Sequence, residues 1–345
     1  MLAYRKFQGV SNLRILVTGG AGFIGSNFVR RTAFSRPEHE VTVLDSLSYA
    51  GRISNLSGLE KEIAFEQGDI RDSKVVDRLV SSVDLVVHFA AESHNDNSLI
   101  SPRPFLETNI MGTYELLQAC VKHSVRLHHI STDEVFGDLP LDGKEKFTHE
   151  TPYNPSSPYS ATKAASDLLV RAWVRSFGLQ ATISNCSNNF GPYQHEEKFI
   201  PRTILLAANG IRPKIYGTGL NVRDWIHVDD HTDGVWAILD RGRIGETYLL
   251  GASGEKSNLA VAQQILALLG LSDDFIEFVA DRPGHDAKYS IDASRTISEL
   301  GWSPREVSFT DRLADVIRHY VSLAMSGGID VSKIAHSDLS TTWPT

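Results

Sequence analysis

Cysteine is scarce in this chain, and basic residues do not gather in any stretch of it. The 345 residues include only Cys120 and Cys186, so we expect no framework of disulfide bonds and a protein of the cytosol. The formal net charge of −8, without a basic stripe, argues against nucleic acid and anionic membranes as partners. The first residues lack the apolar segment of a secretory signal, and no run of about 18 apolar residues predicts a transmembrane helix.

Short apolar runs alternate with segments of helical spacing in the first half of the chain. The apolar runs cover residues 14–18, 41–44, 64–67, 84–90, 125–130 and 181–186. Helical spacing lies between several of them, as at 105–122 and 163–177. Strands that alternate with helices form βαβ units with right-handed crossovers, so we predict an α/β fold with a doubly wound parallel sheet of the Rossmann type.

The regular alternation of strands and helices ends at about residue 190, beyond which Pro, Gly and charged residues separate shorter elements. The helices expected there lie near residues 199–209, 229–240, 257–269 and 309–324. This change predicts a smaller α/β lobe at the C-terminal end of the chain.

The segment TGGAGFIGS follows the first predicted strand and opens a predicted helix. Gly20, Gly22 and Gly25 fit the spacing G-x-G-x-x-G, and Gly19, Gly22 and Gly25 fit a wider G-x-x-G-x-x-G. Glycines permit a tight turn and let backbone N–H groups approach a pyrophosphate at the helix N-terminus. The segment predicts a dinucleotide site, although glycines in such a turn also serve packing alone.

Two acidic residues at the ends of predicted strands refine the expected ligand. Asp45 lies 20 residues after Gly25, where a carboxylate accepts hydrogen bonds from ribose hydroxyls and repels a 2′-phosphate. NAD is therefore favoured over NADP. Asp69 ends the third strand, where it either closes over the adenine or belongs to an ordinary turn.

Tyr159 and Lys163 are four residues apart in a predicted helix, so they lie on one face about 6 Å apart along its axis. A lysine ammonium beside a phenol favours the phenolate, which predicts a lowered pKa for Tyr159. Such a phenolate takes a proton from a substrate hydroxyl while a hydride leaves the same carbon for nicotinamide. The spacing alone is common by chance, and the glycine motif before it gives it weight.

Two adjacent carboxylates, Asp133 and Glu134, follow Thr132 at the end of a predicted buried strand. A polar turn on the surface carries such a pair for solubility alone. In an active site, like charges in contact push their pKa values apart, so that one group stays an acid while the other acts as a base.

Together these segments resemble the dTDP-glucose 4,6-dehydratases of the extended short-chain dehydrogenase/reductase superfamily. The resemblance runs from about residue 14 to 325 and rests on TGGAGFIGSNFV, LDSLSYAG, AAESHNDNS, STDEVFG, PYSATKAASD, NCSNNFGPYQHEEKFIP, IYGTGLNVRDWIHVDDH and DRPGHDAKYSID. It implies an NAD-dependent lyase of deoxysugar biosynthesis, for instance on the route to dTDP-rhamnose. The product would be dTDP-4-keto-6-deoxyglucose.

The resemblance also implies roles for the five residues expected to be catalytic. Tyr159, with Lys163, would take the proton of the sugar 4-hydroxyl. Glu134 would remove the C5 proton as general base, and protonated Asp133 would donate to the departing 6-hydroxyl. Thr132 would hydrogen-bond the 4-oxygen.

The expected binding residues form two groups, and no metal ligand is expected. The cofactor group is Gly19, Gly22, Phe23, Ile24, Gly25, Asp45, Ser46, Leu47, Ser48, Gly51, Asp69, Ile70, Phe89, Ala90, Ala91, Ser93, Thr108, Tyr159, Lys163 and Asn189. The substrate group is Ser93, Thr132, Asn188, Lys198, Phe199, Lys214, Tyr216, Arg223, Asn258, Arg282 and His285. For Arg223, a local ion pair with Asp224 is the competing interpretation, and Asn258 is equally well a surface polar residue.

Four parts of the chain are expected. They are an N-terminal extension (1–13), an NAD-binding Rossmann domain with the catalytic residues (14–189), a substrate-binding lobe with an interleaved boundary (190–328) and a loose C-terminal tail (329–345).

Three residues depart from the family pattern. Phe136 stands where tyrosine is usual, and Asn95 and Asn97 stand where valine and arginine are frequent. The asparagines put in doubt any contact that an arginine at 97 would make at the cofactor edge or the substrate loop.

Three alternatives stay open at this point. The nucleotide of the sugar could be UDP, because one methyl group separates thymine from uracil. The chain could be a non-catalytic NAD-binding regulator, because fold does not imply function. The family forms homodimers through the helices at 105–122 and 159–177, but burial within the monomer also explains their extra apolar residues.

Overall fold

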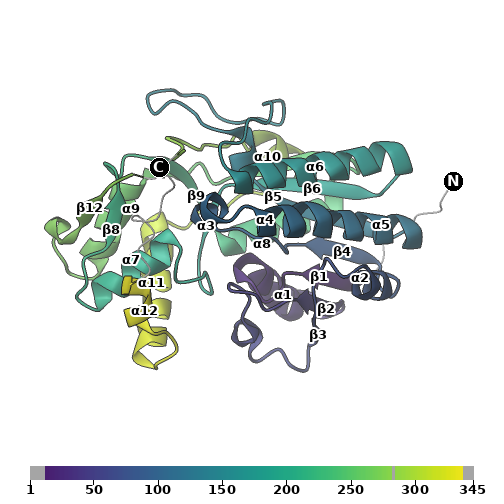
Figure 1. The fold of residues 1–345 in the computed structure, drawn as a ribbon, viewed down its shortest axis with the longest axis horizontal. Coiled ribbons are helices and arrows are strands. Elements are labelled where there is room, and N and C mark those ends of the chain that lie inside the picture. Colours follow the sequence, from purple (N-terminus) through teal and green to yellow (C-terminus); the bar gives the residue numbers. More distant parts are fainter. Residues whose placement is uncertain (1–11, 282–283, 337–345) are drawn as a thin grey trace.

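The structure is a computed structural model that describes residues 12–281 and 284–336. Most of the expected N-terminal extension, Arg282 and the last nine residues of the expected tail lie outside the described residues. The predicted fold class is confirmed. A seven-stranded parallel sheet has the order β10-β6-β5-β4-β1-β2-β3 and is flanked by helices (Figure 1).

Six of the seven strands were predicted. The strands of this sheet are β1 (Arg14–Thr18), β2 (Glu40–Asp45), β3 (Ile63–Gln67), β4 (Leu85–His88), β5 (Arg126–Thr132), β6 (Ala181–Cys186) and β10 (Thr247–Leu250). Strands covered on both faces need continuous apolar sequence, and Ile15, Leu16 and Val17 of β1 are all fully buried.

Helices cover both faces of the sheet, and side chains alternate between two cores. Ile15 and Val17 pack in one core with α1 and α8, whereas Leu16 packs in the other with α2, α5 and α6. These helices are α1 (Phe23–Ser35), α2 (Ser73–Val80), α5 (Thr113–His123), α6 (Pro158–Phe177) and α8 (Val228–Arg241). Short helical segments connect them: η1 (Ile53–Leu56), α3 (Asn95–Ile100), α4 (Arg103–Phe105), η2 (Leu106–Gly112) and η3 (Asp133–Phe136).

Helix α6 carries Tyr159 and Lys163, and its boundaries follow from local sequence. Ser157 and Ser160 form a capping box, each hydroxyl accepting from the other's backbone N–H at 3.1 Å. Pro158 occupies the first helical position, and Gly178 ends the helix in the left-handed conformation at φ 68°. The first turns therefore bring Tyr159 and Lys163 to the buried face of the helix.

A smaller lobe lies to the left in Figure 1 and has two cores of its own. Its strands form a sheet of order β11-β9-β7 and a pair β12-β8. The elements are β7 (Asn188–Phe190), α7 (Phe199–Ala208), β8 (Lys214–Tyr216), β9 (Val222–His227), β11 (Glu255–Ser257), α9 (Asn258–Leu268), η4 (Asp273–Phe275), β12 (Glu277–Val279), α11 (Phe309–Met325) and α12 (Val331–His336).

Two features differ from the expected division of the chain. Helix α8 and strand β10 lie beyond residue 190 but belong to the main sheet and its core, and α10 (Ser294–Leu300) packs beside them. The expected loose tail is wrong for residues 329–336, because Ile329 and Ile334 are buried in the lobe core against α7 and α11. None of the helices in the described ranges has the length and apolar character to span a bilayer.

We predict that Ile334→Ala lowers the free energy of unfolding by about 2 kcal/mol, because it removes a buried side chain that joins α12 to the lobe core. Lys333→Ala, which changes an exposed residue of the same helix, should stay within about 0.5 kcal/mol of the wild type. Urea unfolding of both variants checks this. Equal midpoints for the two would contradict the docking of α12.

Candidate active site

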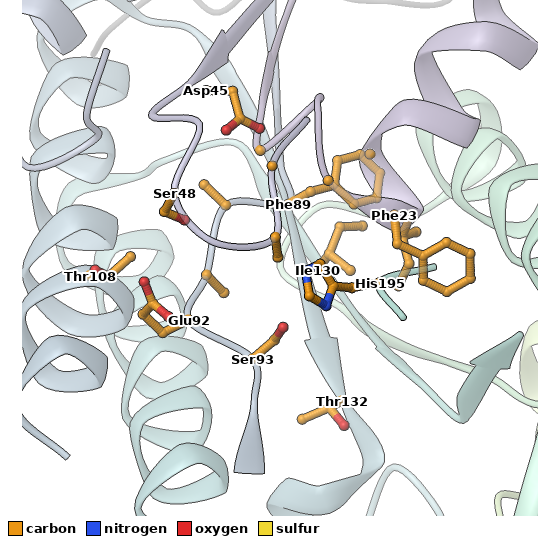
Figure 2. A pocket seen from close by; sticks show the side chains of 18 of the residues that line it. Phe23, Asp45, Ser48, Phe89, Glu92, Ser93, Thr108, Ile130, Thr132 and His195 are labelled. Atoms are coloured by element: carbon orange, nitrogen blue, oxygen red, sulfur yellow. The ribbon is translucent and has the colours of Figure 1, made fainter. Parts of the chain in front are cut away.

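A cavity of about 350 Å³ opens at the carboxyl ends of the central strands. In a doubly wound sheet this edge is where ligands bind. Figure 2 shows Asp45 at one end of the cavity and Thr132 at the other, with Ser93 between them.

The structure brings nearly all the predicted cofactor residues to this cavity. Leu47 is the exception, because its side chain packs against a core of the main domain instead. Of the residues predicted for catalysis or substrate, Thr132, Asp133, Tyr159, Lys163, Ser93, Asn188 and Lys198 also line it.

The glycine-rich loop leaves no room for side chains. Gly19 has φ 70°, and a Cβ on it would lie 2.5 Å from the backbone nitrogen of Ala90. A Cβ on Gly25 would collide with the carbonyl oxygen of Gly19. Helix α1 begins directly after Gly22 without a side-chain cap, so its first N–H groups are directed to the cavity as donors for a phosphate.

Asp45 holds two loops together at the far end of the cavity. Its Oδ2 accepts from the Ala21 N–H and its Oδ1 from the Leu47 N–H, both at 2.9 Å. Burial raises the pKa of Asp45, and these backbone donors oppose the rise. A carboxylate has lone pairs beyond these two bonds, so it can still accept from ribose hydroxyls. Asp69 lines the cavity too, but its carboxylate pairs with Arg71 at 2.6 Å.

Lys163 is buried beside strand β5 and close to a buried contact between His129 and Asp167. Its Nζ donates to the Ile130 carbonyl at 2.7 Å and lies 3.5 Å from His129 Nε2. Burial lowers the pKa of Lys163 to about 8. His129 Nε2 is in turn 3.2 Å from Asp167 Oδ1, and Asp167 Oδ2 accepts from the Tyr153 hydroxyl at 2.8 Å.

The expected lowering of the Tyr159 pKa is wrong for the protein alone. Burial raises the pKa of Tyr159 well above its ordinary value, and the nearby Glu134 and Cys186 add to this effect. The desolvation of a buried phenolate therefore outweighs the ammonium of Lys163, which is held by the Ile130 carbonyl.

Thr132, Asp133 and Glu134 form the turn between β5 and η3. Thr132 caps η3, since its Oγ1 accepts from the Glu134 N–H at 3.3 Å. Asp133 is only 1% exposed, and its Oδ2 has no hydrogen-bond partner within the described chain. Burial raises the pKa of Asp133 well above its ordinary value, and the charge of Glu134 raises it further. Glu134 is only half-buried, and its Oε2 accepts from Asn95 Nδ2 at 3.0 Å.

Phe136, where the family pattern has tyrosine, lies in an aromatic cluster. Its ring stacks on Phe147 at 5.2 Å and meets Tyr153 edge-on at 5.3 Å. The side chain is 4% exposed, so the residue acts in packing.

The other predicted substrate residues lie in the smaller lobe and do not line this cavity. Arg223 is buried over the Tyr289 ring and donates to the carbonyls of Val222 and Asp286. Asp224 accepts from the backbone of Gly254 and Ala252 instead of pairing with it. The remaining positions are Phe199 at the start of α7, Lys214 and Tyr216 in β8, Asn258 at the start of α9, and His285, whose ring meets that of Tyr216 edge-on.

Several residues at the site were missed. Tyr49, Glu92 and His195 line the cavity, although each lies inside a segment that carries the family resemblance. Asp167 stands four residues after Lys163, which is the same helical spacing that revealed the Tyr159–Lys163 pair. The described residues contain no group of three or more histidine, cysteine, aspartate or glutamate side chains that could hold a metal ion.

Known proteins similar to this chain include dehydratases of nucleotide sugars. The family model described as GDP-mannose 4,6 dehydratase matches residues 16–316. A dTDP-glucose 4,6-dehydratase of Mycobacterium tuberculosis is 58% identical over 308 residues, which cover 89% of this chain and 93% of that protein.

Two solved structures of dTDP-glucose 4,6-dehydratases are also similar to this chain. The dTDP-glucose 4,6-dehydratase DesIV of Streptomyces venezuelae, solved with NAD and TYD bound, is 46% identical with a TM-score of 0.86, over 90% of this chain and 97% of that one. The dTDP-glucose 4,6-dehydratase of Bacillus anthracis in complex with NAD is 39% identical with a TM-score of 0.84, over 90% and 97%. The chain therefore belongs to the GDP-mannose 4,6-dehydratase family, and within it to the relatives of the dTDP-glucose 4,6-dehydratases.

Proposed function

We propose that this protein is an NAD-dependent lyase that converts dTDP-glucose into dTDP-4-keto-6-deoxyglucose and water. The observation that carries the proposal is the pair Asp133 and Glu134 beside Tyr159. Asp133 is buried, has a raised pKa and keeps one oxygen without a hydrogen-bond partner among the described residues, whereas Glu134 is half-buried. A simple dehydrogenase needs no such acid and base, whereas removal of water from adjacent carbons needs both.

NAD fits the far end of the cavity. The uncapped N-terminus of α1 would hold the pyrophosphate, and Asp45 would accept from the adenosine ribose. The chemistry that NAD supplies when bound is the acceptance of a hydride and its later return to the sugar.

The chain's own residues then handle protons. Tyr159 takes the proton of the sugar 4-hydroxyl, and the Lys163 ammonium favours the phenolate that forms. A ketone at C4 acidifies the C5 hydrogen, which Glu134 removes. Asp133 gives a proton to the 6-hydroxyl, which leaves as water. Glu134 returns its proton to C5, and the proton gained by Tyr159 balances the one lost by Asp133.

Two copies of the chain are proposed to pair through η2, α5 and α6, which lie side by side on one outer face (Figure 1). Large apolar side chains remain exposed on this face, namely Leu106, Met111, Leu168 and Phe177 at 49, 52, 54 and 53%. Burial within the monomer therefore does not account for all of the extra apolar residues on these helices.

The two cysteines are unpaired, which favours a reducing compartment such as the cytosol.

We predict that Glu134→Gln slows product formation from dTDP-glucose by a factor on the order of 10² or more, because it removes the base for C5. The variant should also fail to exchange the C5 hydrogen with deuterium from D2O, which NMR of the sugar measures. Glu145→Gln, which removes an exposed carboxylate, serves as the matched control and should exchange like the wild type. Normal C5 exchange by Glu134→Gln would assign the base elsewhere.

We predict that Leu168→Arg converts a homodimer into monomers, because an arginine in an apolar contact face would be desolvated without a partner. Light scattering after size exclusion should give twice the chain mass of 38.1 kDa for the wild type and the single mass for the variant. Phe34→Arg, on α1 away from this face and 68% exposed, should remain dimeric. A wild type of single mass would refute the proposed pairing.

A further inference from the structure

Asn95, a departure from the family pattern, contacts the carboxylate expected to act as the base. Its Nδ2 lies 3.0 Å from Glu134 Oε2, which joins α3 to η3 across the site. Neither a valine nor any other aliphatic side chain offers a donor here. The hydrogen bond to Glu134 therefore depends on the presence of asparagine at position 95.

The surrounding turn holds Asn95 in place. His94 caps α3, with its Nδ1 accepting from the Asn97 N–H at 3.3 Å. The fully buried Ser98 donates its hydroxyl to the Asn95 carbonyl at 2.6 Å. The amide of Asn95 is thus presented by a backbone that is hydrogen-bonded on both sides of it.

Several groups near Glu134 in the described part of the chain are acids or phenols, whose electrostatic influence on one another is unfavourable. Asp133 precedes it in η3, and burial raises the pKa of Asp133, with Glu134 raising it further. Burial raises the pKa of Tyr159 on α6 and of Tyr289, and the charge of Glu134 adds to both.

On the lobe side, Arg223 stands 4.2 Å from the centre of the Tyr289 ring and donates to backbone carbonyls. On α3 itself, Asp96 is buried and adds a further acid to this region. Among these neighbours, the amide of Asn95 contributes a neutral donor directly to the Glu134 carboxylate.

We propose that Asn95 is a positioning residue that orients Glu134 and favours its ionised form, and so sets the lower end of the pH range for removal of the C5 proton. A hydrogen bond donated to a carboxylate stabilises the charged form over the acid. It also selects one rotamer of a half-buried side chain that otherwise has several. The inference rests on the proposed function, because it concerns the base of that reaction.

The test is the pH dependence of kcat and KM for dTDP-glucose with NAD-loaded wild type, Asn95→Ala and Asn95→Asp. Asn95→Ala should move the acid limb of kcat upward by about one pH unit, which is about tenfold in kcat on that limb, with KM within about twofold. Asn95→Asp has the same shape but sets a second carboxylate against Glu134, so its limb should move further in the same direction. Deuterium exchange at C5 should slow in parallel.

Asn97→Ala is the matched control. It lies on the same helix, and no hydrogen bond of its side chain occurs within the described residues. Its backbone N–H donates to His94 and its carbonyl accepts from the Ser101 N–H, so the substitution leaves both backbone contacts in place. Its acid limb should coincide with that of the wild type. Melting temperatures of all variants separate loss of folding from loss of the contact, and Asn95→Asp carries the test if Asn95→Ala does not fold.

Three outcomes are decisive. A shifted acid limb in the Asn95 variants with an unshifted Asn97→Ala supports the inference. An unshifted limb, or an equal fall in kcat at every pH, overturns it while wild-type turnover leaves the dehydratase function standing. Absence of turnover by the wild type overturns the proposed function itself, and the inference with it.

Discussion

The geometry of the site depends on a buried polar network that ties α6 to strands β5 and β6. Lys163 donates to the Ile130 carbonyl of β5, and Asp167 meets His129 of the same strand. Asn185 of β6 donates to Asp167 and to the Thr132 carbonyl, each at 3.0 Å. Because a buried charge without its partner is costly, this network leaves α6 little freedom to slide along the sheet. The network therefore fixes the position of Tyr159 on the helix relative to Thr132 at the end of the strand.

Different degrees of burial give the two adjacent carboxyl groups different chemical properties. Asp133 and Glu134 have the same chemistry and share neighbours, but Asp133 is almost fully covered and Glu134 only half. Desolvation favours the protonated form of the first, while an amide donor supports the charge of the second. The turn at the end of β5 is thus the proposed source of both the acid and the base. The fold thus distinguishes these two carboxyl groups mainly by how far each is exposed to water.

The sequence allowed the sheet and most of the cavity to be predicted, because both depend on local patterns. Continuous apolar runs mark buried parallel strands, and the glycine spacing reflects contacts such as that of Gly19 with Ala90. Strand β10 and helix α12 were missed because tertiary contacts, and not local propensity, determine where they pack. The pKa of Tyr159 was predicted in the wrong direction because the cost of burial cannot be read from a spacing of four residues.

The proposed reaction of this protein is the removal of water from dTDP-glucose. The most direct test incubates the purified protein and NAD with dTDP-glucose, and with UDP-glucose in parallel, and follows each product by mass and by NMR of the sugar. We expect a product from dTDP-glucose that is lighter by one water, carries a ketone at C4 and has a new methyl group at C6. Preferential turnover of UDP-glucose would keep the mechanism but contradict the assigned nucleotide. No dehydration of either sugar by folded, NAD-bound protein would refute the proposed dehydratase function.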